Sequence, residues 1–225
     1  MGELHIRPGD VRAAGTTGRI RAELSRRLLG SDLALGYAGV VTALAVTLTM
    51  LPVRVADHLV IDSSTNLANL RAHPPFVLVV SAFVEPSVWQ LWILVPLLLA
   101  YAELQRWLGR AAVVITAVLG HVGATLFVST ILAAGIAHGR IALSVRNATD
   151  VGVSYGLVAV LGLLTARIPR RWRPWYVIGL TLGFVVSLLG WRSFTELGHF
   201  SAWVIGLGLA VLVHRAQRLP SAPQA

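Results

Sequence analysis

Residues 149–157 read Thr-Asp-Val-Gly-Val-Ser-Tyr-Gly-Leu, and they open an apolar run that continues as Val-Ala-Val-Leu-Gly-Leu-Leu. A carboxylate and a hydroxyl are unusual at the start of such a run, because burying unpaired polar groups costs free energy. The whole chain is apolar: 56% of its 225 residues are hydrophobic and 13% are charged, with a mean hydropathy of +0.72. Soluble domains carry about 25% charged residues. The composition therefore predicts a membrane protein in which the polar groups of 149–157 serve packing or chemistry.

The charged residues narrow the class further. All 19 basic residues are arginines, which together with the abundance of Ala, Leu and Val indicates a bacterial protein and hence a bacterial plasma membrane. A net charge of +9 would suit nucleic acid, but arginine collects at the cytoplasmic ends of membrane proteins, so no nucleic-acid partner is expected. The absence of cysteine excludes disulfides and thiolate metal sites. No phosphate-binding or dinucleotide motif is found, so no cofactor is expected.

Hydropathy along the chain predicts an all-α membrane protein with six transmembrane helices. The predicted spans are 33–52, 87–102, 111–133, 149–166, 174–191 and 197–214. Residues 53–84 mix apolar and polar groups without a full span, so the first loop is expected to carry short helices lying in the membrane interface. Residues 1–32 are predicted to form a cytoplasmic tail with an amphipathic surface stretch rather than a cleavable signal, and residues 215–225 a second cytoplasmic tail.

The arginine distribution predicts the orientation of the six spans. The N-terminal tail holds six arginines, the second connection two, the fourth connection four and the C-terminal tail two, which gives fourteen on one side. The other three connections hold five. Because arginine is enriched on the cytoplasmic side, both termini are expected in the cytoplasm. Residues 33–214 are then expected to lie in the lipid bilayer.

This orientation brings two reactive side chains to one depth. Spans four and six would both run from outside to inside, so Ser154 and His199 each lie roughly 5–10 Å below the outer boundary. A serine in a membrane helix often bonds a carbonyl one turn back. With a histidine at matching depth, a nucleophile and its general base are favoured instead. Small residues on the two spans would let the helices approach closely, namely Gly152, Gly156, Gly162, Gly198, Gly206 and Gly208.

Here the chain resembles the rhomboid family of intramembrane serine proteases. The family's nucleophile lies in a G-x-S-G motif at the start of the fourth core helix, which matches Gly152-Val153-Ser154-Tyr155. Its base opens the sixth core helix in H-x-x-G-x-x-x-G, which matches His199 with Ala202 and Gly206. The likeness covers roughly residues 34–214. It implies a rhomboid-like bundle, a Ser154–His199 catalytic dyad and single-span membrane proteins as substrates.

The chain departs from the family around that dyad. The family's second helix supplies a His and an Asn that help to bind the oxyanion, whereas the matching positions here are Ser87 and Leu91, or Trp89 and Ile93. Tyr155 stands in place of a glycine after the nucleophile. Loss of one oxyanion donor typically costs about 100–1000-fold in turnover. The resemblance therefore implies either a rebuilt site or a rhomboid fold without proteolysis.

Other polar residues could support such a site. Asp150 lies four residues before Ser154, so a helix through both would allow an Asp–His–Ser arrangement; the alternative is that Asp150 caps span four. His121 near the middle of span three is either functional or a neutral histidine bonded to a neighbour. Backbone N–H groups at the start of span four, Thr149, Tyr155 and His121 are the candidate oxyanion donors. Tyr155 is the weaker of these, because its side chain is expected to pack against span two or five.

Three hypotheses about function remain. The first is an intramembrane serine endopeptidase that cleaves single-span substrates near their outer boundary. The second is a non-proteolytic rhomboid-like protein that binds membrane helices. The third is a small transporter or metal-binding protein that uses His121, Asp150 and His199, although clustered ligands of the kind a metal site needs are not evident.

Overall fold

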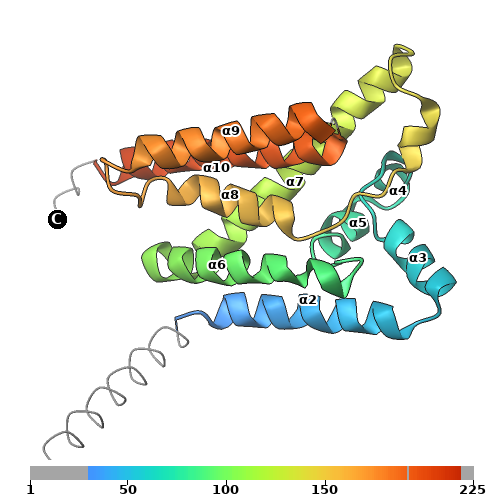
Figure 1. Cartoon of the computed structure of the whole chain (residues 1–225), viewed down its shortest axis with the longest axis horizontal. Coiled ribbons are helices and arrows are strands. Elements are labelled where there is room, and N and C mark those ends of the chain that lie inside the picture. The colour runs from blue at the N-terminus through green and yellow to red at the C-terminus, as the bar shows by residue number, and fades with distance from the viewer. Residues whose placement is uncertain (1–29, 192, 219–225) are drawn as a thin grey trace, which may run out of the picture.

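The computed structural model describes residues 30–191 and 193–218, and every regular element within them is a helix (Figure 1). The elements are α2 (Asp32–Met50), α3 (Val53–Asp62), α4 (Leu67–Ala72), α5 (Pro74–Val80), η1 (Val88–Ile93), α6 (Leu94–Leu108), α7 (Arg110–Ala137), η2 (Leu143–Asn147), α8 (Ser154–Leu164), α9 (Arg173–Trp191) and α10 (Phe194–Ala216). The prediction of an all-α fold is confirmed. The predicted amphipathic stretch before residue 30 and the last seven residues of the C-terminal tail lie outside the described residues.

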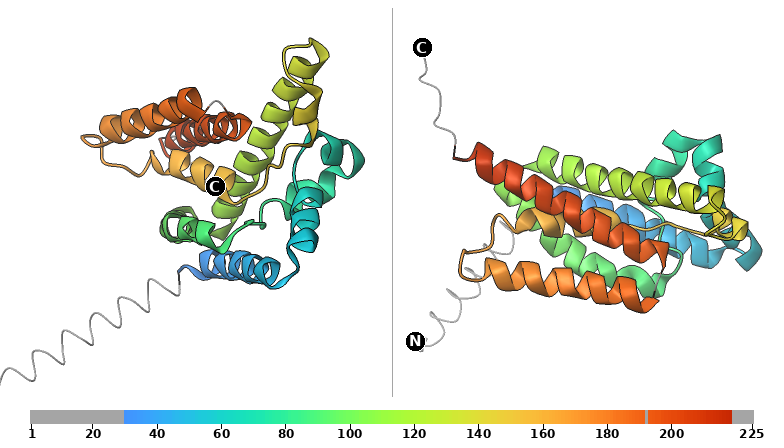
Figure 2. Two further views of the ribbon diagram at one scale, coloured as in Figure 1. Left: turned by 45° about the vertical axis from the view of Figure 1, so that its right-hand side comes forward. Right: turned by 90° about the horizontal axis from the view of Figure 1, so that it is seen from above.

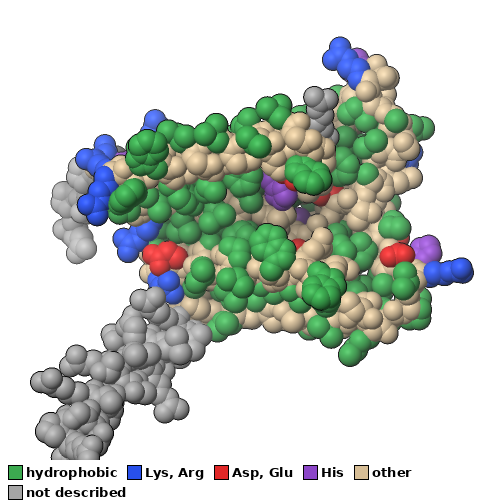
Figure 3. Space-filling view, viewed as in Figure 1, with side chains coloured by type: hydrophobic (Ala, Val, Ile, Leu, Met, Phe, Trp, Pro, Cys, Tyr) green, Lys and Arg blue, Asp and Glu red, His purple; other side chains and the backbone are tan. Residues whose placement is uncertain are grey.

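Within the described part of the chain, five helices are long and apolar enough to cross a membrane. They are α2, the continuous η1–α6 segment, α7, α9 and α10. Apolar side chains cover much of their outer surface, as Figure 3 shows, and this is the surface that lipid tails can solvate. The chain is therefore a multi-pass membrane protein.

The fourth predicted span, 149–166, is wrong in its bounds. The helix α8 begins only at Ser154 and ends at Leu164, so its 11 residues reach about 16 Å, half the thickness of the hydrocarbon core. From Tyr155 to Leu164 every residue except Leu161 is buried, because α8 packs against α6, α7 and α10 (Figure 2). Irregular backbone at membrane depth is tolerated where protein covers it. The non-helical residues 149–153 can therefore complete the path beside the first loop.

The second and third spans also extend beyond their predicted bounds. The segment predicted as 87–102 begins as the 3₁₀ helix η1 and continues to Leu108, and the segment predicted as 111–133 runs from Arg110 to Ala137. Only Gly109 separates α6 from α7, and its φ of +88° is a conformation that favours glycine. The connection predicted between these spans, 103–110, is therefore a single residue.

The crossing of α8 and α10 depends on two glycines. A Cβ atom on Gly206 would lie 2.2 Å from the carbonyl oxygen of Ala159, and one on Gly162 would lie 2.8 Å from Cα of Gly206. These two residues confirm the predicted small-residue contact. Gly208 was wrongly included, since it faces open space, and Gly156 faces Tyr101 and Ala117 of α6 and α7 instead of α10.

The first loop forms three short helices, α3 to α5, at one end of the bundle (Figure 1). Its residues after α3 are attached to the segment before α8. The Thr65 N–H donates to the Asp150 carbonyl oxygen at 2.9 Å, and the Asp150 N–H donates to Ser64 Oγ at 2.7 Å. The loop therefore holds the backbone that leads into α8.

Candidate active site

A constrained backbone places Ser154 at the first position of α8. Gly152 adopts φ +130°, where an L side chain is strained, and a Cβ there would lie 3.2 Å from Oε1 of Glu85. The Gly152 N–H donates to the Ser81 carbonyl oxygen at 2.9 Å, and the Val153 N–H donates to Glu85 Oε1 at 3.3 Å. The segment between α5 and η1 thus fixes the two residues before Ser154.

His199 lies on the second turn of α10, and its ring faces Ser154. Ser193 caps this helix, since its Oγ accepts the Glu196 N–H at 3.2 Å. The distance between His199 Nε2 and Ser154 Oγ is 2.9 Å. Both side chains are therefore within the hydrogen-bonding range that a nucleophile and its base require.

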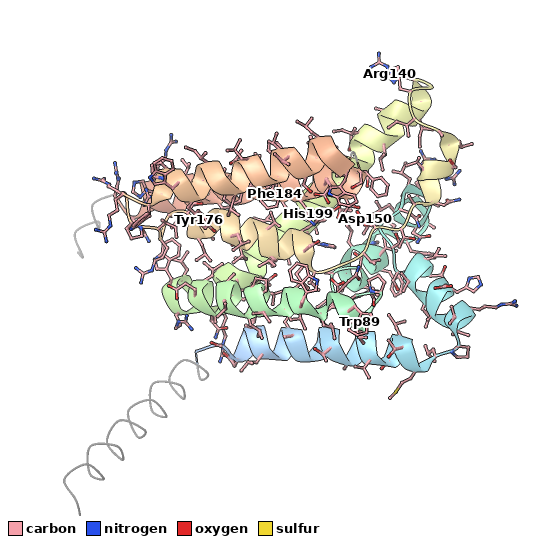
Figure 4. The ribbon with its side chains drawn as sticks, in the orientation of Figure 1. Trp89, Arg140, Asp150, Tyr176, Phe184 and His199 are labelled. Atoms are coloured by element: carbon pink, nitrogen blue, oxygen red, sulfur yellow. The ribbon has the colours of Figure 1, made fainter. Side chains whose placement is uncertain are left out.

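The structure corrects both interpretations of Asp150. Because α8 begins at Ser154 with Val153 as its N-cap, Asp150 neither shares a helical face with Ser154 nor caps the helix. Its carboxylate instead accepts the Tyr155 hydroxyl at 3.1 and 3.2 Å, and the Thr65 hydroxyl at 3.3 Å. Figure 4 shows Asp150 and His199 on facing segments of the site. Asp150 is thus bonded to its neighbours, and its contacts lie with the first loop and α8.

The ring of Tyr155 contacts His199 directly. Its ring meets the ring of His199 edge-on, with centroids 5.3 Å apart and planes at 79°. A Cβ on Gly198 would lie 2.2 Å from the Tyr155 ring, so the glycine makes room for it. Tyr155 thus lies between Asp150 and α10, and it belongs to a buried cluster against which side chains of α9 pack.

His121 is buried near the middle of α7. Its Nε2 lies 3.0 Å from Ser81 Oγ, which agrees with a histidine bonded to a neighbour, while its Nδ1 has no hydrogen-bond partner among the described residues. The ring also lines a small pocket together with Ser154, Gly152 and Thr65. His121 therefore does reach the level of Ser154, on the side of the serine that faces α7.

Ser154 and His199 open into a cleft of about 380 Å³ between η1 and α10. Figure 3 shows its mouth, where histidine and acidic side chains lie between the upper and lower helices. Three polar residues of the cleft were not predicted from the sequence, namely Glu85, Gln90 and Thr195. Gln90 is the single amide side chain in 81–102, which could have identified it. Because η1 is a 3₁₀ helix, residues three apart share a face, so Gln90 and Ile93 both line the cleft.

A third acidic residue lies against the histidine. Oε2 of Glu196 is 3.4 Å from Nδ1 of His199, on the ring edge opposite to Ser154. Glu196 was not among the site residues predicted from the sequence. Among those residues no group of three or more His, Cys, Asp or Glu side chains could hold a metal ion. The constellation is thus a hydroxyl, an imidazole and a carboxylate beside a cleft that faces the membrane helices.

Comparison with known proteins agrees with this architecture. Residues 34–219 match the family described as rhomboid-like protein, so the match spans nearly all of the helical bundle. The comparisons with curated proteins and with solved structures found no match. Since the family match covers well over half of the chain, the chain belongs to the rhomboid-like protein family.

Proposed function

We propose that this chain is an intramembrane serine endopeptidase that uses Ser154 as nucleophile and His199 as general base. The observation that supports the proposal most directly is the 2.9 Å contact between Ser154 Oγ and His199 Nε2. Two apolar helices bring these groups together at their N-terminal ends, and the pair faces a cleft instead of a sealed core. A purely structural pair would not need access to a cleft.

The chemistry follows from the pair. Ser154 Oγ attacks the carbonyl carbon of the scissile peptide while its proton moves to His199 Nε2. The C–N bond then breaks, the protonated imidazole gives its proton to the leaving nitrogen, and the peptide carbonyl remains on Ser154 as an ester. Water then attacks the ester with His199 again as base, which restores the serine and releases the new carboxylate.

Stabilisation of the oxyanion is assigned to the first turn of α8 and to His121. The N–H groups of Ser154, Tyr155 and Gly156 have no acceptor within the helix, because a helix leaves its first N–H groups free. His121 lines the small pocket beside them with an unpartnered ring nitrogen. Gln90 offers an amide from the cleft side. These donors stand in for the family's second-helix pair.

The substrate class is a single-span membrane protein that enters the cleft from the lipid. Trp89 and Trp92 of η1 are largely exposed on that side, and α9 has no buried residue along its length. An extended peptide can reach Ser154 there without crossing a soluble domain. With the predicted topology, cleavage takes place near the outer boundary of a bacterial plasma membrane.

The competing function is a non-proteolytic rhomboid-like protein that binds membrane helices in the same cleft. The observation that favours it is that the family's oxyanion-binding His and Asn are both replaced. The matching positions hold Ser87 and Leu91, or Trp89 and Ile93. A transporter or metal-binding function has less support, because His121, Asp150 and His199 do not gather around one point in the described chain.

Labelling with a fluorophosphonate, a reagent that reacts with activated serines, distinguishes these functions. The purified wild type is expected to be labelled, and both Ser154→Ala and His199→Ala are expected to lose labelling and nearly all cleavage of a single-span test substrate. Ser201→Ala, on the same helix as His199 but bonded to Leu197, is the control. Equal residual cleavage in the wild type and both site variants would refute the proposal that the protein is an endopeptidase.

A further inference from the structure

The carboxylate of Glu196 lies in line with the proposed nucleophile and base. It contacts His199 Nδ1 at 3.4 Å, while Nε2 of the same ring contacts Ser154 Oγ at 2.9 Å. Both Glu196 and His199 have about one fifth of their side chains exposed, 20% and 19%. The pair is therefore shielded from most of the solvent screening that weakens surface ion pairs.

The local sequence predicts a different role for this glutamate. Ser193-Phe-Thr-Glu196 is a capping box, in which the glutamate at the third helical position normally reaches back to the backbone N–H of the cap residue. One half of the box is present, since Ser193 Oγ accepts the Glu196 N–H. The side chain, however, accepts the Ser187 hydroxyl from α9 at 2.7 Å and faces the imidazole. A second helix therefore helps to aim the carboxylate at His199.

Asp150 does not fill this position. The described groups that titrate around His199 are Glu196 on α10, Asp150 before α8 and Tyr155 on α8. The Asp150 oxygens accept hydroxyls from Tyr155 and Thr65, and Tyr155 presents the edge of its ring. Glu196 is the carboxylate with a hydrogen-bonding contact to the imidazole.

We propose that Glu196 is the positioning residue of this site and that Ser187 holds it in place. The carboxylate accepts the Nδ1–H of His199, which keeps Nε2 free to take the Ser154 proton and favours the imidazolium that forms. Glu196 touches no substrate. The inference rests on the proposed function, and it extends a Ser–His dyad to a Ser–His–Glu line.

Kinetics of matched variants test the proposal. Glu196→Gln keeps the size of the side chain and an acceptor but removes the charge, so kcat is expected to fall about 10–1000-fold with KM changed less than about twofold. Ser193→Ala is the matched control, because it removes the cap of the same helix and leaves the carboxylate in place. It is expected to lower the melting temperature by about 2–4 °C and to leave kcat within about twofold. Ser187→Ala should give an intermediate loss of kcat.

The same kinetic measurements can also overturn the proposal. If Glu196→Gln keeps kcat within twofold, or if Ser193→Ala loses as much kcat as Glu196→Gln does, the glutamate serves only the helix end. Glu196→Asp provides a further check, because a shorter carboxylate should recover part of the kcat that Glu196→Gln loses. No recovery beyond the level of Glu196→Gln counts against a charge-based role.

A spectroscopic measurement separates this inference from the proposed function. In protein labelled with ¹⁵N-histidine, the His199 signals, assigned by their loss in His199→Asn, should show the proton on Nδ1 in the wild type. In Glu196→Ala this preference should be lost, whether or not the protein cleaves anything. If the wild type and Ser154→Ala are equally inactive, the proposed function fails, and the tautomer alone decides the role of Glu196. A proton on Nε2 in the wild type would overturn it.

Discussion

Tyr155 joins two parts of the site through one side chain. Its hydroxyl donates to the Asp150 carboxylate, and its ring rests edge-on against His199. The hydroxyl thus stabilises a buried carboxylate, and the ring separately helps to orient the imidazole. Gly198 leaves the space that this arrangement needs.

Tyr155→Phe should separate the two contributions. The ring stays beside His199, but Asp150 loses its hydroxyl donor, so stability is expected to fall by about 1–3 kcal/mol. Fluorophosphonate labelling at a temperature below unfolding should stay within a few-fold of the wild type. Thermal unfolding in detergent measures the first effect. An unchanged melting temperature would show that the Asp150 contact contributes nothing.

Glu85 is a second buried carboxylate behind the nucleophile. Its Oε1 accepts the Val153 N–H, and it is only 6% exposed. Burial raises the pKa of the Glu85 carboxyl above its usual value, although the Val153 hydrogen bond opposes the rise. The folded protein therefore holds a proton here at pH values where the unfolded chain has released it.

The raised pKa of Glu85 predicts how the stability of the protein depends on pH. Between the unfolded pKa of about 4.3 and the higher folded value, the wild type loses stability as pH rises. Glu85→Gln keeps an acceptor for Val153 and removes the charge. The melting temperature of this variant, relative to that of the wild type, should therefore rise as pH increases from 4 to 7. Unfolding scans across that range measure the difference. A difference that stays constant with pH contradicts the buried charge.

Part of this site could be predicted from the sequence, and the reason is geometric. Counting 1.5 Å per residue along two spans was enough to bring Ser154 and His199 to one depth, and the structure places them in contact. The partners of Asp150 were out of reach, because Thr65 is 85 residues away in the chain. Gln90 was missed because the oxyanion donors were sought only at the positions matching the family's second helix, which here begins as the 3₁₀ helix η1.

At the scale of elements, the contact between α8 and α10 decides how close the nucleophile and base can come. Gly206 and Gly162 allow backbone to meet backbone there, with no flexible side chain that could move aside. Trp203, which is fully buried, fills the neighbouring volume. The site therefore depends on a crossing formed about two turns away from Ser154 and His199.

Gly206→Ala is expected to force this crossing apart. Its Cβ would meet the Ala159 carbonyl oxygen at 2.2 Å, so the variant should lose about 1–3 kcal/mol of stability and its labelling at Ser154. Gly208→Ala, two residues along the same helix and facing open space, is the matched control. It should be neutral or gain about 0.5–1 kcal/mol, because alanine suits a helix interior better than glycine. Equal melting temperatures for the two variants would contradict the close crossing.

Hydropathy predicted the long helices well and α8 poorly, for a physical reason. In α2, α7, α9 and α10 the apolar run and the helix coincide, because lipid requires both apolar side chains and satisfied backbone groups. Around α8 neighbouring protein supplies the backbone partners, as Ser64 and Ser81 do for Asp150 and Gly152. The apolar composition therefore extends past the helix, and the sequence alone could not place Ser154 at its first residue.

At the scale of the whole molecule, charge separates the two ends of the bundle. Arginines cluster at the end where α8 leads into α9, whereas the end with α3 to α5 and η2 carries fewer (Figure 3). The topology predicted from the loops, which stays a prediction, puts that arginine-rich end in the cytoplasm. Ser154 and His199 then lie nearer to the outer side.

Cysteine labelling tests this topology without background, because the natural chain has no cysteine. In intact cells, a membrane-impermeant maleimide should label Arg140→Cys, beyond the end of α7, and should leave Arg171→Cys, between α8 and α9, unlabelled until the membrane is opened. Labelling of residue 171 with protection of residue 140 would invert the orientation and place the cleft on the cytoplasmic side.

The attachment of the first loop to Asp150 has a consequence for biosynthesis. Thr65 leaves the ribosome 85 residues before its partner, which at about 5–20 residues per second is a delay of about 4–17 s. During that interval the second and third spans, η1–α6 and α7, are made, but α3 to α5 still lack the hydrogen bonds to Asp150. A nascent chain stalled before residue 150 should therefore be cut by added protease within 53–80, and one released at full length should resist.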